Sequence, residues 1–282
     1  MTRDDQLRWE ARWAIPAAIA AFAAGVLTLV WMTTFIPEDR EGIETTPDFL
    51  LSINDNPTAY MTSAVLASVA ALLLVGVFLY LFRAVAARGG GVPQWFVYMV
   101  VAAPILYAIS RVAYANEAID IADEFASGTP IRGEAGGDRA YDLSDVSGAV
   151  IALQTAGTVG LAFLFVMLPL RARRVGLLSP FMGVLGAIAG ALVVFPLAGI
   201  STIIQGFWLG ALGALFLGRW PGGREPAWES GEAAPWPSAA QRRGLVPEPE
   251  PAQELDPSAP PPEPEPVPER PASRKRRKKR GR

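Results

Sequence analysis

The side chains that most often carry chemistry are largely missing from this chain. Its 282 residues include neither cysteine nor histidine. Without cysteine there are no disulfides, thiolate metal sites or thiol nucleophiles, and without histidine the commonest general base and metal ligand is absent. The sequence also contains no phosphate-binding glycine loop and no nucleophile elbow. We therefore expect a protein that is not an enzyme and that holds no cofactor or metal ion.

The strongest polar residues within apolar stretches are two glutamines, Gln154 and Gln205. They lie in the fourth and sixth of the helices predicted below, and hydroxyl side chains accompany both. One interpretation places them in a polar pocket that binds a small molecule between those two helices. The other is that they form interhelical hydrogen bonds, as polar side chains in membranes commonly do.

Arg111 follows directly after the third apolar stretch. It is the charged residue that comes nearest to lying within a predicted span. As a functional residue it would be the counter-ion of an anionic substrate or of an external carboxylate. As a structural residue it would extend its guanidinium to the lipid headgroups. Beyond it, residues 111–125 contain no helix breaker, so the helix should continue past the membrane. Glu117, Asp120 and Glu124 share one side of this extension, as a divalent-cation site or as a solvated acidic face.

The most specific feature of the chain is a run of cations near its C-terminus: Arg274, Lys275, Arg276, Arg277, Lys278, Lys279 and Arg280. It follows residues 246–271, where Pro and Glu dominate and no core can form. We expect residues 219–282 to be a disordered cytoplasmic tail. Its basic tip suits anionic lipid headgroups or weak electrostatic contacts without a dedicated partner, and nucleic acid phosphates are the least favoured of the three.

The elements that must position these residues follow from five stretches without a charged side chain. A stretch of about 20 apolar residues is what a helix needs to cross roughly 30 Å of hydrocarbon. The last stretch is long enough for two helices, with a break near Pro196 and Gly199. The predicted fold is an all-α, polytopic membrane bundle of six transmembrane helices after a short N-terminus, residues 1–12. The helices are predicted at residues 13–36, 60–82, 92–110, 146–170, 178–198 and 200–218.

The basic residues predict the orientation of this bundle. Two short connections carry only cations, Arg83 with Arg88 and then Arg171 with its neighbours Arg173 and Arg174. The alternate connections, residues 37–59 and 111–145, hold 14 acidic residues and four arginines. Because cytoplasmic loops are enriched in Lys and Arg, we predict a bacterial inner-membrane protein with both termini in the cytoplasm.

Small residues recur at four-residue spacing in several predicted helices. Examples are Ala21 with Gly25, Gly186 with Gly190, and Gly206 with Gly210. Such stripes allow two helix backbones to approach closely in lipid. They are expected to pack helices of the same chain, with an oligomer interface as the alternative.

One part of the chain resembles a known group of proteins. Residues 173–180 (Arg-Arg-Val-Gly-Leu-Leu-Ser-Pro), 207–210 (Phe-Trp-Leu-Gly) and 219–223 (Arg-Trp-Pro-Gly-Gly) are similar to segments of uncharacterised six-helix membrane proteins of high-GC bacteria. The resemblance implies the topology and no activity. The preferred hypothesis is a non-enzymatic membrane protein whose bundle anchors an interaction tail. The alternative is a small-molecule transporter or channel with a site near Gln154 and Gln205.

Overall fold

All regular structure in the described part of the computed structural model is helical, as the sequence predicts. The described residues are 2–34, 45–127, 136–143, 146–195, 197, 200–220 and 225–234. Their helices are α1 (Arg3–Thr34), α2 (Thr46–Asp55), α3 (Pro57–Ala87), α4 (Phe96–Ser127), α5 (Gly137–Leu143), α6 (Gly148–Arg174), α7 (Pro180–Val194), α8 (Ile200–Phe216) and α9 (Pro226–Ser230). Of the two units into which the chain divides, 1–236 and 237–282, the second lies outside the described residues.

Four helices are long and apolar enough to cross a membrane: α1, α3, α4 and α6. The remaining two of the six predicted spans are shorter, since α7 has 15 residues and α8 has 17. Residues 178 and 179 do not belong to α7, because the Ser179 side chain accepts a hydrogen bond from the Met182 N–H and caps the helix start at Pro180. The described residues thus contain four complete candidate spans and not the six predicted. These four long apolar helices are compatible with a helical membrane protein.

The long helices extend beyond their apolar stretches, most of all α4 and α1. The helix α4 continues without a break to Ser127, which confirms the predicted extension over residues 111–125. The helix α1 begins at Arg3 and not at Trp13, because residues 3–12 contain no breaker and Thr2 with Asp5 forms a reciprocal cap. Apolar stretches report where lipid surrounds a helix, so they miss turns that continue into water.

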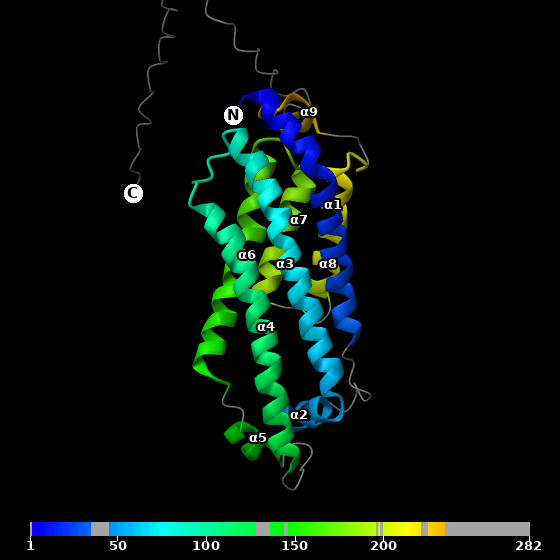
Figure 1. Cartoon of the computed structure of the whole chain (residues 1–282), viewed down its shortest axis with the longest axis vertical. Coiled ribbons are helices and arrows are strands. Elements are labelled where there is room, and N and C mark those ends of the chain that lie inside the picture. The colour runs from blue at the N-terminus through cyan, green and yellow to red at the C-terminus, as the bar shows by residue number, and fades with distance from the viewer. Residues whose placement is uncertain are drawn as a thin grey trace, which may run out of the picture. The chain divides into compact units, whose positions relative to one another are not determined.

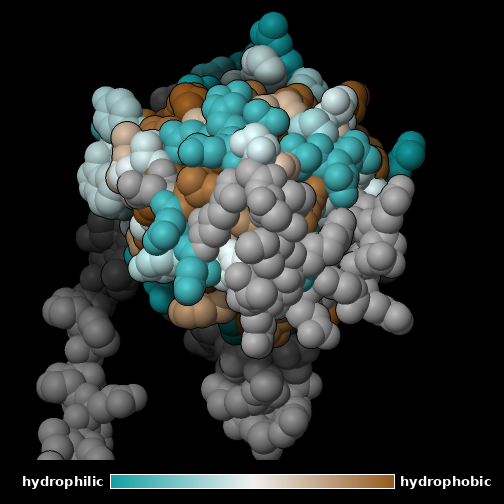
Figure 2. All heavy atoms as spheres, turned by 90° about the horizontal axis from the view of Figure 1, so that it is seen from below, coloured by the Kyte–Doolittle hydropathy of each residue, from teal (hydrophilic) through white to brown (hydrophobic). Residues whose placement is uncertain are grey.

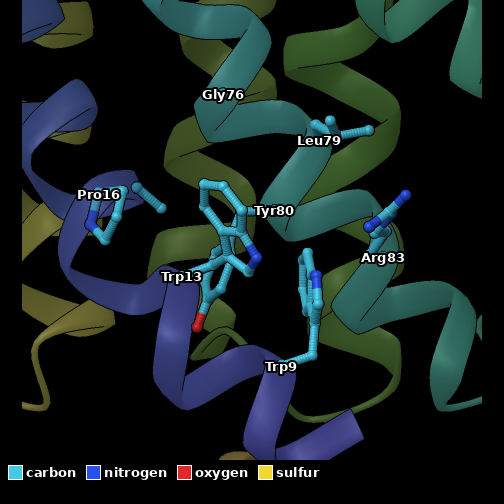
Figure 3. Close-up of a pocket in the computed structure, with 8 residues that line it drawn as sticks. Trp9, Trp13, Pro16, Gly76, Leu79, Tyr80 and Arg83 are labelled. Atoms are coloured by element: carbon cyan, nitrogen blue, oxygen red, sulfur yellow. The ribbon is translucent and has the colours of Figure 1, made fainter.

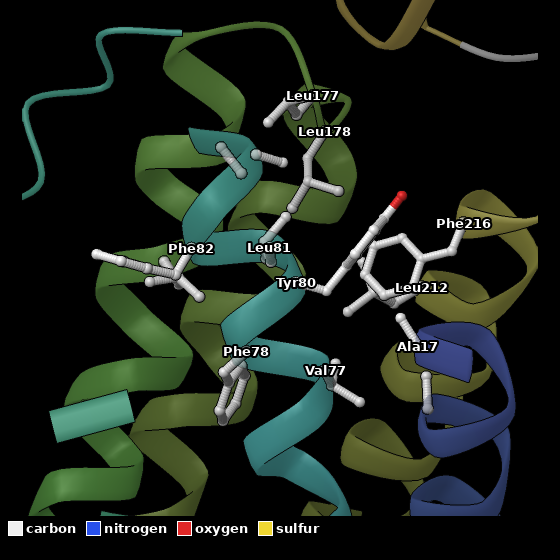
Figure 4. Packing of buried hydrophobic residues seen from close by; sticks show 14 of the residues in the cluster. Ala17, Val77, Phe78, Tyr80, Leu81, Phe82, Leu177, Leu178, Leu212 and Phe216 are labelled. Carbon is white, nitrogen blue, oxygen red and sulfur yellow. The ribbon is translucent and has the colours of Figure 1, made fainter. Parts of the chain in front are cut away.

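The helices form one bundle with a distinct smaller layer at one end (Figure 1). In the bundle α3 lies between α1 and α4, α6 packs on α4 and α7, and α8 returns against α1. The main core gathers large side chains of α3, α6 and α8 around the buried segment after α6; Leu81, Phe78, Leu177, Leu178 and Phe216 are among those drawn in Figure 4. A second core joins α2 and α5 to the last turns of α4.

Glycines let the helix backbones meet inside the chain. A Cβ added to Gly25 of α1 would lie 3.1 Å from the Gly206 carbonyl oxygen of α8. A Cβ on Gly157 of α6 would lie 2.5 Å from the Tyr107 nitrogen of α4, and one on Gly186 would lie 2.6 Å from Pro169 Cγ. These contacts support packing within the chain as the role of the small-residue stripes, except at Gly210, which has no atom within 4 Å of such a Cβ.

The two ends of the bundle differ in charge. Arg83 and Arg88 near the end of α3, with Arg171, Arg173 and Arg174 in the last turn of α6, lie at the end that carries α9 and the start of α1, called here the arginine-rich end. The opposite end, formed by α2, α5 and the last turns of α4, carries most of the described acids. Seen from that side, hydrophilic side chains lie in several groups with apolar ones between them (Figure 2). There the Glu117 carboxylate accepts hydrogen bonds from the N–H and hydroxyl of Ser147, which precedes α6.

We predict that Gly186→Ala destabilises the bundle and that Gly210→Ala does not. The added methyl at position 186 would lie 2.6 Å from Pro169 and 2.9 Å from Trp208, an overlap that typically costs about 1–3 kcal/mol of folding free energy. Tryptophan fluorescence during thermal unfolding of the detergent-solubilised protein gives the comparison. Equal melting temperatures for the two variants would contradict the close packing of α7 on α6.

Candidate functional site

A carboxylate and a guanidinium are buried together at the arginine-rich end. Glu10 of α1 is 3% exposed, and the side chain of Arg88, which follows α3, is 0% exposed. The pair is bidentate, with Nη1 2.5 Å from Oε1 and Nη2 3.0 Å from Oε2. Gln6 also donates to Glu10 Oε1 over 2.7 Å. Such a pair withstands burial only when hydrogen bonds satisfy its remaining donors and acceptors.

The other N–H groups of Arg88 bind backbone carbonyls. Nε and Nη2 donate to the Ala227 carbonyl of α9 at 2.9 and 2.7 Å, and Nη1 donates to the Ala84 carbonyl at 2.9 Å. The guanidinium also lies 5.4 Å from the centre of the Trp228 ring. A residue near the N-terminus, the end of α3 and a helix after the last span therefore meet at one side chain.

Aromatic rings extend this cluster. Tyr80 of α3 stacks between Trp9 of α1 and Trp228 of α9, with ring centres 5.6 and 5.7 Å apart. Its hydroxyl donates to the Glu10 carbonyl over 3.2 Å, and the Trp228 indole N–H donates to the Leu177 carbonyl over 2.9 Å. Two further links are the Ala234 N–H to the Val175 carbonyl and the exposed ion pair of Arg3 with Glu232. Residues 225–234 are thus bound to α1, α3 and the α6–α7 connection.

One carboxyl in this region is buried without a partner. Glu225 precedes α9, and its Oε2 has no hydrogen-bond partner among the described residues. Burial raises the pKa of this carboxyl above its ordinary value.

Beside the ion pair, a groove of about 180 Å³ runs between α1 and α3 (Figure 3). Its walls are Trp9, Trp13, Pro16 and Ala17 from α1 and Gly76, Leu79, Tyr80 and Arg83 from α3. The guanidinium of Arg83 lies 5.2 Å from the centre of the Trp9 ring. All of the groove is apolar or aromatic apart from this one cation at its end. A second groove of about 170 Å³ lies between the start of α4 and the end of α6. Trp95, Phe96 and Arg171 are among the residues that line it.

The predicted polar residues are separate from these features. Gln154 lies near the start of α6 and Gln205 near the start of α8, and both are half-buried. No hydrogen bond joins them within the described residues, and neither lines either groove. The helix α6 packs chiefly on α4 and α7, whereas α8 packs chiefly on α1. Their role as a binding site or as structural residues stays a prediction.

Arg111 is half-buried in α4, with its guanidinium 5.7 Å from the centre of the Trp31 ring. Its Nε is buried and has no hydrogen-bond partner among the described residues.

The acidic residues that follow Arg111 do not form a metal site, because no three carboxylates of the described chain lie close enough to hold a metal ion. Glu117 is bound to Ser147 instead. The basic residues 274–280 lie outside the described residues.

Sequence reasoning missed the buried ion pair. Arg88 is one of the loop cations from which the orientation is predicted, and Glu10 falls within the short predicted N-terminus, residues 1–12. The only signal was that the connection containing Arg83 and Arg88 has no acid of its own, so any buried partner had to come from a distant segment.

Comparisons with family models, with curated proteins and with solved structures find no match to the chain. The resemblance drawn from residues 173–223 therefore stays a prediction, and the proposals below rest on geometry and charge.

Replacing Arg88 with Met should be among the most destabilising single changes in the bundle. It leaves the Glu10 carboxylate buried without a cation, which typically costs about 3–5 kcal/mol. We expect Glu10→Met combined with Arg88→Met to recover much of the lost thermal stability, since an apolar pair removes the unpaired charge. Arg83→Met, which removes an exposed cation from the last turns of α3, is the matched control. A double variant no more stable than Arg88→Met would contradict this account of the ion pair.

Proposed function

We propose that this protein is a non-enzymatic, multi-pass membrane anchor that holds its C-terminal tail at the cytoplasmic face of the membrane. The observation that carries the proposal is the docking of α9. Ala227 and Trp228 belong to the first part of the predicted tail, residues 219–282, and they are buried and bound to Arg88, Tyr80 and Leu177. A helix in this position sets where the remaining chain leaves the bundle.

The membrane arrangement in this proposal includes all six predicted helices. At about 1.5 Å per residue, α7 and α8 are about 22 and 26 Å long, less than the roughly 30 Å of a hydrocarbon core. Their connection is apolar: Phe195 is 73% exposed, Leu197 58% and Ile200 54%. We infer that α1, α3, α4 and α6 cross completely, and that α7 and α8 enter as a hairpin whose turn stays in lipid.

The proposed orientation places the arginine-rich end in the cytoplasm. The start of α1, the end of α3, the α6–α7 connection and α9 all lie at that end, so both termini have the same side whether or not the hairpin crosses fully. The tail would then meet an anionic leaflet, to which each Lys or Arg near the surface contributes about 1 kcal/mol. This supports lipid headgroups over nucleic acid as the partner of residues 274–280.

The transporter or channel alternative has less support. It requires a polar site between α6 and α8, and among the described residues Gln154 and Gln205 share neither a hydrogen bond nor one of the two grooves.

Labelling of single cysteines tests the topology, and the chain has no native cysteine to interfere. In intact cells a membrane-impermeant maleimide should label Ser127→Cys, and it should reach Ala87→Cys only after the membrane is opened. Leu197→Cys should react in neither case until detergent is added, because its neighbours lie in lipid. Labelling of Leu197→Cys in intact cells would show a complete crossing by α7 and α8. Labelling of Ala87→Cys there would overturn the orientation.

Deletion of residues 247–282 tests the anchor role. The truncated chain should still insert and keep its melting temperature, since α9 remains, but it should lose most of its binding to vesicles containing phosphatidylglycerol. Replacement of the seven basic residues 274–280 by Gln is the matched control for charge and should have the same effect. Unchanged vesicle binding and unchanged co-purifying proteins in both variants would remove the support for an interaction tail.

A further inference from the structure

We propose that the groove between α1 and α3 binds one anionic phospholipid, with an acyl chain along its apolar walls and the phosphate at Arg83. This site is separate from the basic tail. It rests on the proposed insertion of the bundle in lipid, and it does not depend on the orientation or on the role of the tail.

The groove is open because small residues line it. Gly76 and Ala17 line it from the two helices, and a Cβ added to Gly76 would meet only the Ala20 Cβ among the described residues, at 3.9 Å. The larger apolar side chains Trp13 and Leu79 also line it, from α1 and α3 respectively (Figure 3). From Gly76 to Arg83 the groove follows α3 for about 10 Å along the helix axis. Its shape and lining suit a hydrocarbon chain that lies parallel to the helices.

Charge is confined to one end of the groove. Arg83 is exposed and forms no ion pair with any described residue, unlike the buried Arg88 five residues later. Arg12, three residues after Trp9, is exposed on the same flank of α1 and has no described ion pair either. Basic pockets between membrane helices recognise anionic headgroups in this way. An anionic phospholipid satisfies both parts of the groove, whereas a zwitterionic lipid would offer these cations no net charge.

The aromatic residues of the groove favour a position at the depth of the lipid headgroups. Trp9 and Trp13 line the groove at the end of α1 nearest Arg83, and indole rings prefer the boundary between headgroups and acyl chains. The Trp9 ring stacks on Tyr80 on one side and carries the Arg83 guanidinium nearby. The stacking holds the guanidinium at the mouth of the groove, where a phosphate would lie.

Native mass spectrometry of the full-length protein in neutral detergent tests the site, with added phosphatidylglycerol or phosphatidylcholine. The wild type should hold one tightly bound phosphatidylglycerol in preference to phosphatidylcholine. Gly76→Leu fills the groove and should weaken this first binding step at least about fivefold. Arg83→Gln should remove the preference between the two lipids, and Arg83→Lys should keep most of it. Arg174→Gln removes an exposed cation at the same end outside the groove and should bind as the wild type does.

Several results would overturn the proposal. Equal binding of both lipids by the wild type would remove the anionic assignment, and wild-type affinity in Gly76→Leu would exclude the groove as the site. A dimer that is lost only in Gly76→Leu would assign the groove to a second copy of the chain. Arg83 is exposed, so Arg83→Gln still decides the question if Gly76→Leu fails to fold. A failure here leaves the topology and tail experiments unaffected, because those do not involve this groove.

Discussion

Removing a guanidinium and a carboxylate from water is costly, and at the arginine-rich end of this bundle both are removed completely. Hydrogen bonds offset this cost, because Arg88 donates its N–H groups to the Glu10 carboxylate and to the carbonyls of Ala84 and Ala227. Each of these partners belongs to a different turn or helix, so the pair forms only when α1, α3 and α9 have taken their final places. The positions of the N-terminus and of the chain leaving α8 both depend on this one cluster.

The rest of the bundle follows a different physical rule. In lipid there is little hydrophobic gain from bringing helices together, so close backbone contact and a few interhelical hydrogen bonds hold them. Gly25, Gly157 and Gly186 each lie against another helix where no side chain fits, and the Trp208 indole N–H donates to the Met182 carbonyl. Packing by small residues brings the helices together along their length, while the polar cluster fixes one end of the bundle and the second core closes the other.

This division bears on function. The described residues contain no grouping of His, Cys or carboxylates suited to metal chemistry, and every N–H group of the buried Arg88 guanidinium donates to Glu10 or to a backbone carbonyl. The features that remain available are at the surface: an unpaired arginine at the mouth of an apolar groove, and a tail whose starting point is held by α9. The apolar groove and the long apolar helices are both compatible with a membrane protein.

The sequence by itself determined the helical class, the approximate place of each long apolar helix, the continuation of α4 to Ser127 and the difference in charge between the two ends. These follow from local composition: runs without charge, the absence of breakers, and the side on which arginines collect. Only the tertiary structure decided that Glu10 pairs with Arg88, that Trp228 returns to stack on Tyr80, and that α7 and α8 are too short to match the other spans. The first two join residues 78 and 148 positions apart, and no local pattern encodes which distant carboxylate or ring will reach a given cation. The third depends on where helices begin and end inside a continuous apolar stretch, with α7 starting after Ser179 and ending before Phe195, and hydropathy does not register such boundaries.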